Sequence, residues 1–178
     1  MPNTWTLKDK SFEKYIISQD IQAAIDGLAQ RINQEMVGKN PVFVIVLNGA
    51  FIFASDLIKK VKIDCEIAFV KLSSYAGTSS TGIVREVMGL DIDLKERTVI
   101  IIEDIVDTGL TLDSFLNTVW KMGPADVKVA TCLLKPEAFK DRFPVEYVCF
   151  RIPNEFVVGY GLDYDGLGRN SEDIYKIK

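Results

Sequence analysis

The chain has 178 residues, 48% of them hydrophobic, which is enough to bury a core in one domain of ordinary size. Its 21 basic and 25 acidic residues give a formal net charge of −4 and form no basic run, so nucleic-acid binding is not expected. There is no histidine, which excludes histidine triads and histidine metal sites.

The first ten residues are polar and contain no apolar segment of the signal-peptide type. The longest apolar run, around residues 42–53, is interrupted by Asn48 and Gly49 and is too short to span a bilayer. The three cysteines form no CxxC pair, and an odd number argues against a disulfide framework. We therefore expect a cytoplasmic protein that does not contact a membrane.

Apolar residues at helical spacing predict an amphipathic helix from Gln19 to about Met36, with Ser18 as its N-cap. The continuous β-branched run Pro41–Leu47 is typical of a strand buried on both faces. A turn and a second helix, from about Ala50 to Lys59, follow this strand. The chain therefore begins with alternating helices and strands.

The alternation continues along the chain. The further predicted elements are strands at Cys65–Leu72, Thr98–Ile102, Val127–Leu134, Tyr147–Phe150 and Phe156–Val158, and a helix at about Thr111–Lys121. This pattern predicts an open, mostly parallel sheet with helices on its faces. Ligands of such sheets bind beyond the carboxyl ends of the strands.

The segment Ser73–Ile83 is small, polar and without periodicity. It is either a plain linker or a lid over an active site. Loops of about a dozen residues inside compact domains are more often functional than decorative. This length slightly favours the lid.

The stretch Val99–Leu112 is the most informative part of the sequence. A buried strand leads to two adjacent carboxylates, Glu103 and Asp104, and a third, Asp107, follows before a turn that opens a helix. Backbone N–H groups and the helix dipole at such a turn suit a phosphate, and Gly109 lets the backbone come close to it. The adjacent carboxylates can accept hydrogen bonds from two sugar hydroxyls. The stretch therefore predicts a ribose-phosphate site.

Three other interpretations of this stretch are weaker. The adjacent acids, taken alone, are most simply solvated. Asp-Thr-Gly is also the aspartic-protease triplet, but that mechanism needs two carboxylates that share a proton, and the triplet occurs once in a chain of α/β pattern. A Walker-type nucleotidase is excluded because GxxxxGK[ST] is missing.

The run Val99–Leu112 resembles the 5-phosphoribosyl-1-pyrophosphate (PRPP) signature of the type I phosphoribosyltransferases: four apolar residues, two acids, two variable residues and Asp-Thr-Gly-x-Thr. Other segments resemble the hypoxanthine/guanine branch, so the likeness covers nearly the whole chain. They are Val46–Ala50, Ser73–Tyr75, Leu133–Pro136, Phe156–Asp163 and Arg169.

The resemblance implies the type I phosphoribosyltransferase fold, an α/β fold with a mostly parallel twisted sheet flanked by helices. It implies a single domain over residues 1–178, with a core at about 37–150. A small hood lobe is expected from the two chain ends, namely the N-terminal segment and about 151–178.

The resemblance also implies a reaction of purine salvage. The 5-phosphoribosyl group of PRPP is transferred to N9 of hypoxanthine or guanine, and pyrophosphate is released with Mg²⁺ as cofactor. Glu103 and Asp104 would hold the ribose hydroxyls, and Asp107 would face N7 of the base as general base and acid. The 5′-phosphate would bind the phosphate turn, formed by Asp107, Thr108, Gly109, Leu110 and Thr111.

The family binds pyrophosphate at a loop that contains a cis peptide bond. Leu47, Asn48 and Gly49 resemble this pyrophosphate loop, and Arg169 would pair with the same ligand. The chain departs from the family at Asn48 and Leu110, where many members have a basic residue. A charged contact from either position cannot be carried over.

The resemblance places the purine at Lys135, Phe156, Val157 and Asp163. An ammonium offers only donors, so Lys135 would pair with a 6-oxo group, and adenine is expected to be a poor substrate. Phe156 would stack on the base, while the backbone of Val157 would read its edge. These contacts predict a 6-oxopurine acceptor.

The resemblance implies Glu103, Asp104 and Asp163 as the Mg²⁺ ligands, and carboxylate oxygens suit this hard cation. Ser74 and Tyr75 of the lid would cover the reacting centre, because an oxocarbenium-like transition state must be kept from water. A homodimer or homotetramer is implied.

Two alternatives remain open from the sequence. One is a xanthine-preferring enzyme with the same chemistry. The other is a regulator with this fold that senses PRPP and binds RNA, which would need a basic face that this acidic chain lacks in sequence.

Overall fold

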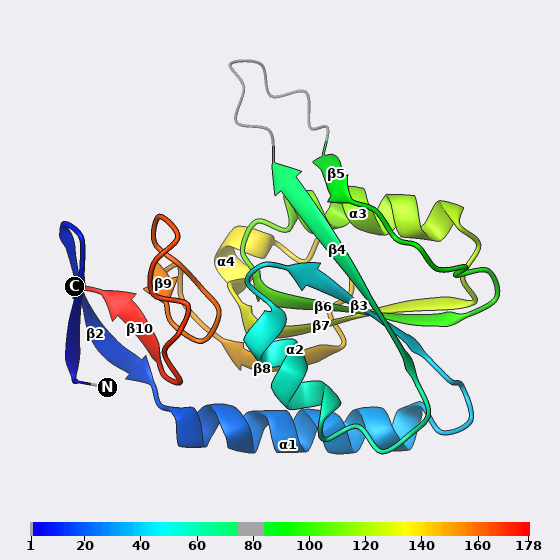
Figure 1. The fold of residues 1–178 in the computed structure, drawn as a ribbon, viewed down its shortest axis with the longest axis horizontal. Helices are drawn as coiled ribbons and strands as arrows, with labels where there is room; N and C mark the ends of the chain where they lie inside the picture. Colours follow the sequence, from blue (N-terminus) through cyan, green and yellow to red (C-terminus); the bar gives the residue numbers. More distant parts are fainter. Residues whose placement is uncertain (1, 75–83) are drawn as a thin grey trace.

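A six-stranded sheet forms the centre of the protein in the computed structural model, which describes residues 2–74 and 84–178 (Figure 1). Its strands are β3 (Val42–Leu47), β4 (Glu66–Ser74), β5 (Val84–Met88), β6 (Thr98–Val106), β7 (Asp126–Leu134) and β8 (Tyr147–Arg151). The order is β5-β4-β3-β6-β7-β8, and all neighbours are parallel except β5 and β4. The predicted parallel α/β sheet is confirmed.

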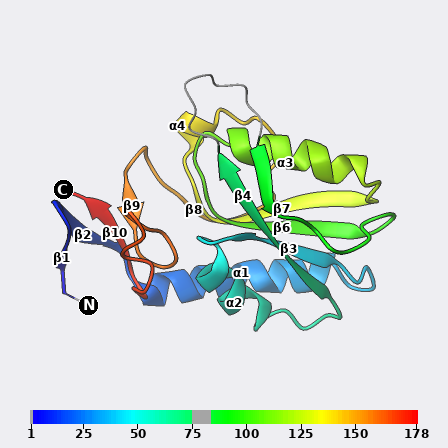
Figure 2. The ribbon, with the colours of Figure 1, turned by 45° about the horizontal axis from the view of Figure 1, so that its top comes forward.

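Helices cover both faces of this sheet. They are α1 (Ser18–Glu35), α2 (Phe51–Ile58), α3 (Leu110–Lys121) and the short α4 (Pro136–Phe139). Figure 2 shows α1 and α2 on one side of the sheet and α3 on the other. Each side has its own apolar cluster, and the central strands β3 and β6 contribute alternate residues to both. This explains why those two strands are apolar without interruption.

A second, antiparallel sheet is built from the two ends of the chain. Its order is β1 (Thr4–Leu7), β2 (Lys10–Ile16), β10 (Ile174–Ile177) and β9 (Val157–Val158). With the segments 152–156 and 159–173, this sheet makes up the hood, which lies beyond the main sheet in Figure 1 and has a small apolar core of its own. The hood implied by the family resemblance is therefore present. Strands β1, β2 and β10 show no clear period in sequence and were not predicted individually.

The predicted N-cap of α1 is wrong. The helix begins at Ser18 itself, after Ile17, and no side chain within the helix caps it. Instead, the Ser18 N–H donates to Oδ1 of Asp173 at 2.8 Å, across 155 positions of sequence. A local capping signal cannot reveal a cap that arrives from the other end of the chain.

Strand β6 continues past its predicted end at Ile102. It pairs with β3 as far as Ile102 and with β7 as far as Val106. Glu103 and Asp104 therefore lie within the strand and not after it, just beyond the point where its pairing with β3 stops. Strand β5 was also not predicted.

Cys132 is buried, Cys65 and Cys149 are half-buried, and all three are free thiols. Across the described ranges, no helix is long and apolar enough to cross a bilayer.

Asp173 joins the hood to the main body. Its buried carboxylate accepts the Ser18 N–H and also pairs with Nζ of Lys14 at 2.7 Å. Burial alone would raise the pKa of Asp173, but the hydrogen bonds from Lys14 and Ser18 outweigh burial and lower the pKa below its ordinary value of 3.8. The ionised carboxylate of Asp173 therefore stabilises the fold, and this stabilisation is fully present above pH 3.8.

Asp173→Ala is expected to lower the free energy of unfolding at pH 7 by about 1–3 kcal/mol, because two donors lose a charged acceptor. The loss should shrink as the pH falls through the lowered pKa, because protonation then removes the same interaction from the wild type. Thermal unfolding at pH 7 and pH 3 measures both effects.

Asp165→Asn is the control for this variant. Asp165 forms an exposed ion pair with Lys8 and has φ 50°, a conformation that asparagine tolerates. It should change the unfolding temperature little. An equal loss in the two variants would contradict the role given to Asp173.

Candidate active site

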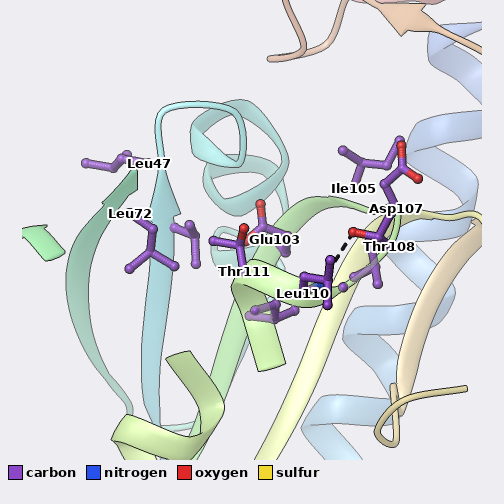
Figure 3. Close-up of a pocket in the computed structure, with 12 residues that line it drawn as sticks. Leu47, Leu72, Glu103, Ile105, Asp107, Thr108, Leu110 and Thr111 are labelled. Carbon is purple, nitrogen blue, oxygen red and sulfur yellow. Dashed lines mark hydrogen bonds between the residues drawn. The ribbon is translucent and has the colours of Figure 1, made fainter. Parts of the chain in front are cut away.

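A cavity of about 280 Å³ opens at the carboxyl end of the main sheet. Figure 3 shows Glu103 and Thr111 facing it, with Leu47 and Leu72 together on one side. Its lining is formed by Val46, Leu47, Leu72, Glu103 and residues Ile105 to Leu112. The whole predicted phosphate turn therefore lines one cavity, where an α/β sheet is expected to bind ligands.

The phosphate turn is held from behind. Gly109 has φ 74°, and a Cβ there would lie 2.8 Å from the ring of Phe139. Nε of Arg142 donates to the carbonyl of Thr108 at 2.9 Å. The Leu110 N–H donates weakly to Oγ1 of Thr108 at 3.5 Å (Figure 3). The turn thus requires glycine at its centre for both conformation and packing.

The first N–H groups of α3 begin at this turn. A helix has no internal acceptors for these groups, and its dipole adds partial positive charge there. The side chain of Leu110 is 57% exposed and brings no charge, so this position offers an anion its backbone. The turn is suited to a phosphate without a basic side chain at that position.

Glu103 and Asp104 have different surroundings, although they are adjacent. Glu103 lines the cavity, whereas Asp104 packs on Gly49 so closely that a Cβ on that glycine would overlap the carboxylate. Oδ1 of Asp104 also accepts the Ile105 N–H at 2.8 Å. The two acids were expected to bind a pair of hydroxyls in the same way, and only Glu103 lines the cavity.

The carboxyl groups of these two residues both have raised pKa values. Burial, and then the charge of Asp104, raise the pKa of Glu103 well above its ordinary value. Burial also raises the pKa of Asp104, although the hydrogen bond with Glu103, the Ile105 N–H and nearby Arg169 oppose the rise. Adjacent, half-buried acids with raised pKa values at a cleft are typical of functional sites.

Asp107 and Lys135 form an ion pair at the edge of the cavity. Nζ of Lys135 lies 2.7 Å from Oδ2 of Asp107. Lys135 is buried, follows β7 and precedes α4, while the Asp107 side chain is 46% exposed. A buried ammonium needs such a partner. The pair presents a donor and an acceptor side by side.

The pyrophosphate loop contains the cis peptide bond that the resemblance implied, between Leu47 and Asn48. The Asn48 side chain is exposed. Gly49 lies between the Asp104 carboxylate and the hood, because a Cβ on Gly161 would overlap the Gly49 carbonyl oxygen. Two glycines therefore allow the hood to touch this loop.

Arg169 is tied into the hood and is not a solvated surface arginine. Its Nη1 donates to the Gly161 carbonyl at 2.6 Å, and its Nη2 lies 2.6 Å from Oδ1 of Asp163. The other oxygen of Asp163 accepts the Gly166 N–H at 2.7 Å. The predicted pyrophosphate residue and the predicted metal ligand thus pair with one another.

Phe156 presents an exposed ring beside the hood sheet, while the neighbouring Val157 is buried. The ring contacts Tyr164 edge-on at 5.9 Å between centroids and Phe12 at 6.2 Å. The Phe156 ring is therefore packed against these two aromatic rings on one side and exposed to solvent on another.

Of the two residues predicted to belong to a lid, Ser74 ends β4, and Tyr75 lies outside the described residues.

Within the part of the chain that the structure describes, no three acidic or cysteine side chains gather into a metal cluster. Glu103, Asp104 and Asp163 are therefore not a preformed cage. Mg²⁺ in proteins is commonly held by one or two carboxylates together with substrate phosphates and water. The carboxylates present fit this arrangement.

Sequence reasoning missed two supports of the site. One is the brace of Phe139 and Arg142 behind the phosphate turn. The other is a hydrogen bond of 2.7 Å from the Tyr160 hydroxyl to Asp56 in α2. The glycine at position 109 gave a partial signal for the first, because a glycine at a turn often marks close packing. No local signal exists for the second.

The chain is similar to the phosphoribosyl transferase domain family over residues 13–165. It is 42% identical to hypoxanthine-guanine phosphoribosyltransferase of Streptococcus thermophilus over 177 residues, which cover 94% of this chain and 98% of that protein. For the Mycobacterium tuberculosis enzyme of the same name, the identity is 39% over 157 residues, or 84% and 78% of the two chains.

The fold is similar to a crystal structure of hypoxanthine phosphoribosyltransferase from Staphylococcus aureus. The TM-score is 0.89 at 38% identity, and the match covers 93% of this chain and 91% of that one. The likeness in sequence and in structure therefore extends over both sheets.

Glu103→Gln is expected to stabilise the free protein at neutral pH. A carboxyl group whose pKa is raised in the folded protein destabilises the fold once the pH exceeds its ordinary pKa of 4.5. The destabilisation is largest at pH values above the raised pKa, and the uncharged amide of glutamine removes it. We expect the unfolding temperature to rise by about 3 °C at pH 8 and by less at pH 5. Calorimetry at both pH values measures it.

The same substitution at the exposed Glu137 is the control and should leave the unfolding temperature unchanged at both pH values. A larger gain at pH 5 than at pH 8 in Glu103→Gln would show that the sign of the shift is wrong.

Proposed function

The chain belongs to the phosphoribosyltransferase family, and from this we propose that it transfers the 5-phosphoribosyl group of PRPP to N9 of hypoxanthine or guanine. The products are pyrophosphate and IMP or GMP, as in purine salvage. The observation that carries the choice of acceptor is the Asp107–Lys135 pair at the rim of the phosphate cavity.

This pair suits one edge of a 6-oxopurine. The acceptor Oδ2 of Asp107 and the donor Nζ of Lys135 lie 2.7 Å apart, and N7 and O6 are neighbours on the same purine edge. Lys135 donates to O6, while Asp107 takes up or returns the proton at N7. A 6-amino group in the place of O6 would meet another donor, which disfavours adenine.

The other contacts follow from the same placement. The 5′-phosphate binds the phosphate turn, and Glu103 accepts from the ribose hydroxyls with Asp104 behind it. The exposed ring of Phe156 stacks on the base, and the Val157 backbone reads its edge. The position of each group around one cavity or its rim supports these roles.

Pyrophosphate binds between the pyrophosphate loop and Arg169. The Arg169 guanidinium gives up its ion pair with Asp163 in order to bind the pyrophosphate. Mg²⁺, when bound with PRPP, neutralises the pyrophosphate, and we assign Glu103, Asp104 and Asp163 as the residues that would hold it, directly or through water. Ser74 and Tyr75 would shield the reacting centre.

We further propose that the main sheet and the hood act as one domain in a cytoplasmic homodimer or homotetramer. The hood supplies Arg169 and Phe156 and the main sheet supplies the phosphate turn, which supports a single catalytic unit. Oligomeric state is measured by sedimentation at several concentrations.

The proposed function is tested by an absorbance assay with PRPP, Mg²⁺ and one of hypoxanthine, guanine, xanthine or adenine. Turnover of hypoxanthine and guanine with little turnover of adenine is expected. Turnover of xanthine alone would favour the xanthine-preferring enzyme. PRPP binding without any turnover, together with salt-dependent RNA binding, would support the regulator instead.

Asp107→Asn should lower kcat by about 10²-fold or more, because the amide cannot exchange the N7 proton. Asp141→Asn is the matched control: Asp141 is exposed, has φ 49° and lies away from the cavity lining. It should keep full activity. Full turnover in the Asp107 variant would remove that residue from its proposed role.

A further inference from the structure

Asp56 of α2 is a carboxylate that the proposed reaction does not use. It nevertheless accepts hydrogen bonds from three side chains at 2.7 Å: Tyr160 and Gln22 bond to Oδ2, and Lys59 bonds to Oδ1. Burial alone would raise the pKa of Asp56, but these three donors outweigh it and lower the pKa. Asp56 therefore remains an ionised acceptor over the neutral range.

The Tyr160 end of this bond is equally constrained. The side chain is 4% exposed and the backbone has φ 51°, a conformation that residues other than glycine rarely adopt. Burial and the bond to Asp56 raise the pKa of Tyr160, so its hydroxyl keeps the proton that it donates. Surrounding contacts must hold a residue in such a conformation.

The next residue, Gly161, touches two predicted pyrophosphate groups. Its N–H donates to the Arg169 carbonyl at 2.9 Å, and its own carbonyl accepts Nη1 of Arg169 at 2.6 Å. Its Cα lies against the carbonyl oxygen of Gly49. The position of Tyr160 therefore determines how the hood meets the pyrophosphate loop.

Asp56 lies on the helix that this loop opens. Helix α2 begins at Phe51, directly after the loop, and the Phe51 N–H reaches the Asn48 carbonyl at 3.5 Å. The bond between Asp56 and Tyr160 thus closes a ring of contacts. The ring runs from α2 through the hood and back to the loop that precedes α2.

We propose that Asp56 is a positioning residue that, through Tyr160, holds the hood against the pyrophosphate loop and preorganises the site for the pyrophosphate half of the donor. This inference rests on the proposed function. Without the bond, the loop and Arg169 must be ordered when the ligand arrives, and that ordering lowers affinity. The base side of the hood is held separately, through the pairing of β9 with β10.

The chain contains a matched control. The Tyr147 hydroxyl donates to Oε2 of Glu35 at 2.6 Å and is likewise a buried tyrosine bonded to a carboxylate on a helix. That bond joins β8 to α1, and neither residue lines the cavity. Tyr160→Phe and Tyr147→Phe therefore remove the same kind of bond in two places, and only the first adjoins the site.

The test is calorimetric titration of the wild type and both variants with two probes, pyrophosphate with Mg²⁺ and IMP. IMP occupies the base, ribose and 5′-phosphate sites but not the pyrophosphate site. In Tyr160→Phe the dissociation constant of pyrophosphate should rise about tenfold, which corresponds to about 1.4 kcal/mol, and that of IMP should change less than about twofold. Tyr147→Phe should change neither constant.

Asp56→Ala, which leaves the Tyr160 hydroxyl without its acceptor, serves as the second variant and also replaces Tyr160→Phe if that protein does not fold. The double variant should bind pyrophosphate no more weakly than the weaker of the two single variants, because both remove the same bond. Unchanged pyrophosphate binding in these variants would overturn the proposal. So would an equal weakening in Tyr147→Phe, since that would reflect lost stability alone.

Failure of the proposed function would be visible before any variant is made. A wild-type protein that binds neither IMP nor pyrophosphate would remove the assigned reaction. A wild-type protein that binds both, with Tyr160→Phe unaltered, would remove only the role of Asp56.

Discussion

The site depends on the point at which two neighbouring strands stop pairing. Strand β6 stays paired with β7 as far as Val106, but its pairing with β3 stops at Ile102, although β3 itself continues to Leu47. Beyond that point the ends of both strands line the cavity, Val46 and Leu47 from β3 and Glu103 from β6. The phosphate turn follows where β6 itself ends.

A second constraint is that the charged side chains of the site need partners when no ligand is bound. The predicted ligand-binding groups at the edges of the site are satisfied by one another: Lys135 by Asp107, and Arg169 by Asp163. Each pair spares the free protein an unpartnered charge in a partly buried place. In the proposed function, pyrophosphate oxygens replace the Asp163 carboxylate at Arg169, so that this exchange of partners requires little new desolvation of the cation.

The sequence predicted the parts of the fold that repeat a simple pattern. Strands β3 and β6 are apolar without interruption because both of their faces are covered, and α1 shows its apolar stripe openly. The turn that lines the cavity before α3 was predicted because Asp107 and Gly109 lie close together in the chain. The hood strands β1 and β2 are short and show no clear strand pattern, and they form by pairing, β1 with β2 and β2 with β10.

The contacts that could not be predicted are those between residues far apart in sequence. Asp173 capping α1, Tyr160 bonding to Asp56, and the reach of Arg142 to the phosphate turn depend on tertiary packing alone. For the same reason, the sequence proposed Lys135 and Asp107 as site residues but did not predict their pairing. Local patterns report what a residue is suited to do, whereas its partner is decided by the fold.

The bond from Asp173 to the start of α1 has a consequence for the order of events on the ribosome. Helix α1 leaves the ribosome early, but its cap is synthesised more than a hundred residues later, as is the strand β10 that pairs with β2. Strand β2 must wait for its second partner, β10, while the parallel sheet has all its strands by Arg151. Contacts of such long range form slowly and late. The hood, and with it Arg169 and Phe156, is thus the last part to assemble, so that the contributions proposed for these two residues are in place only when the carboxyl-terminal strand has joined.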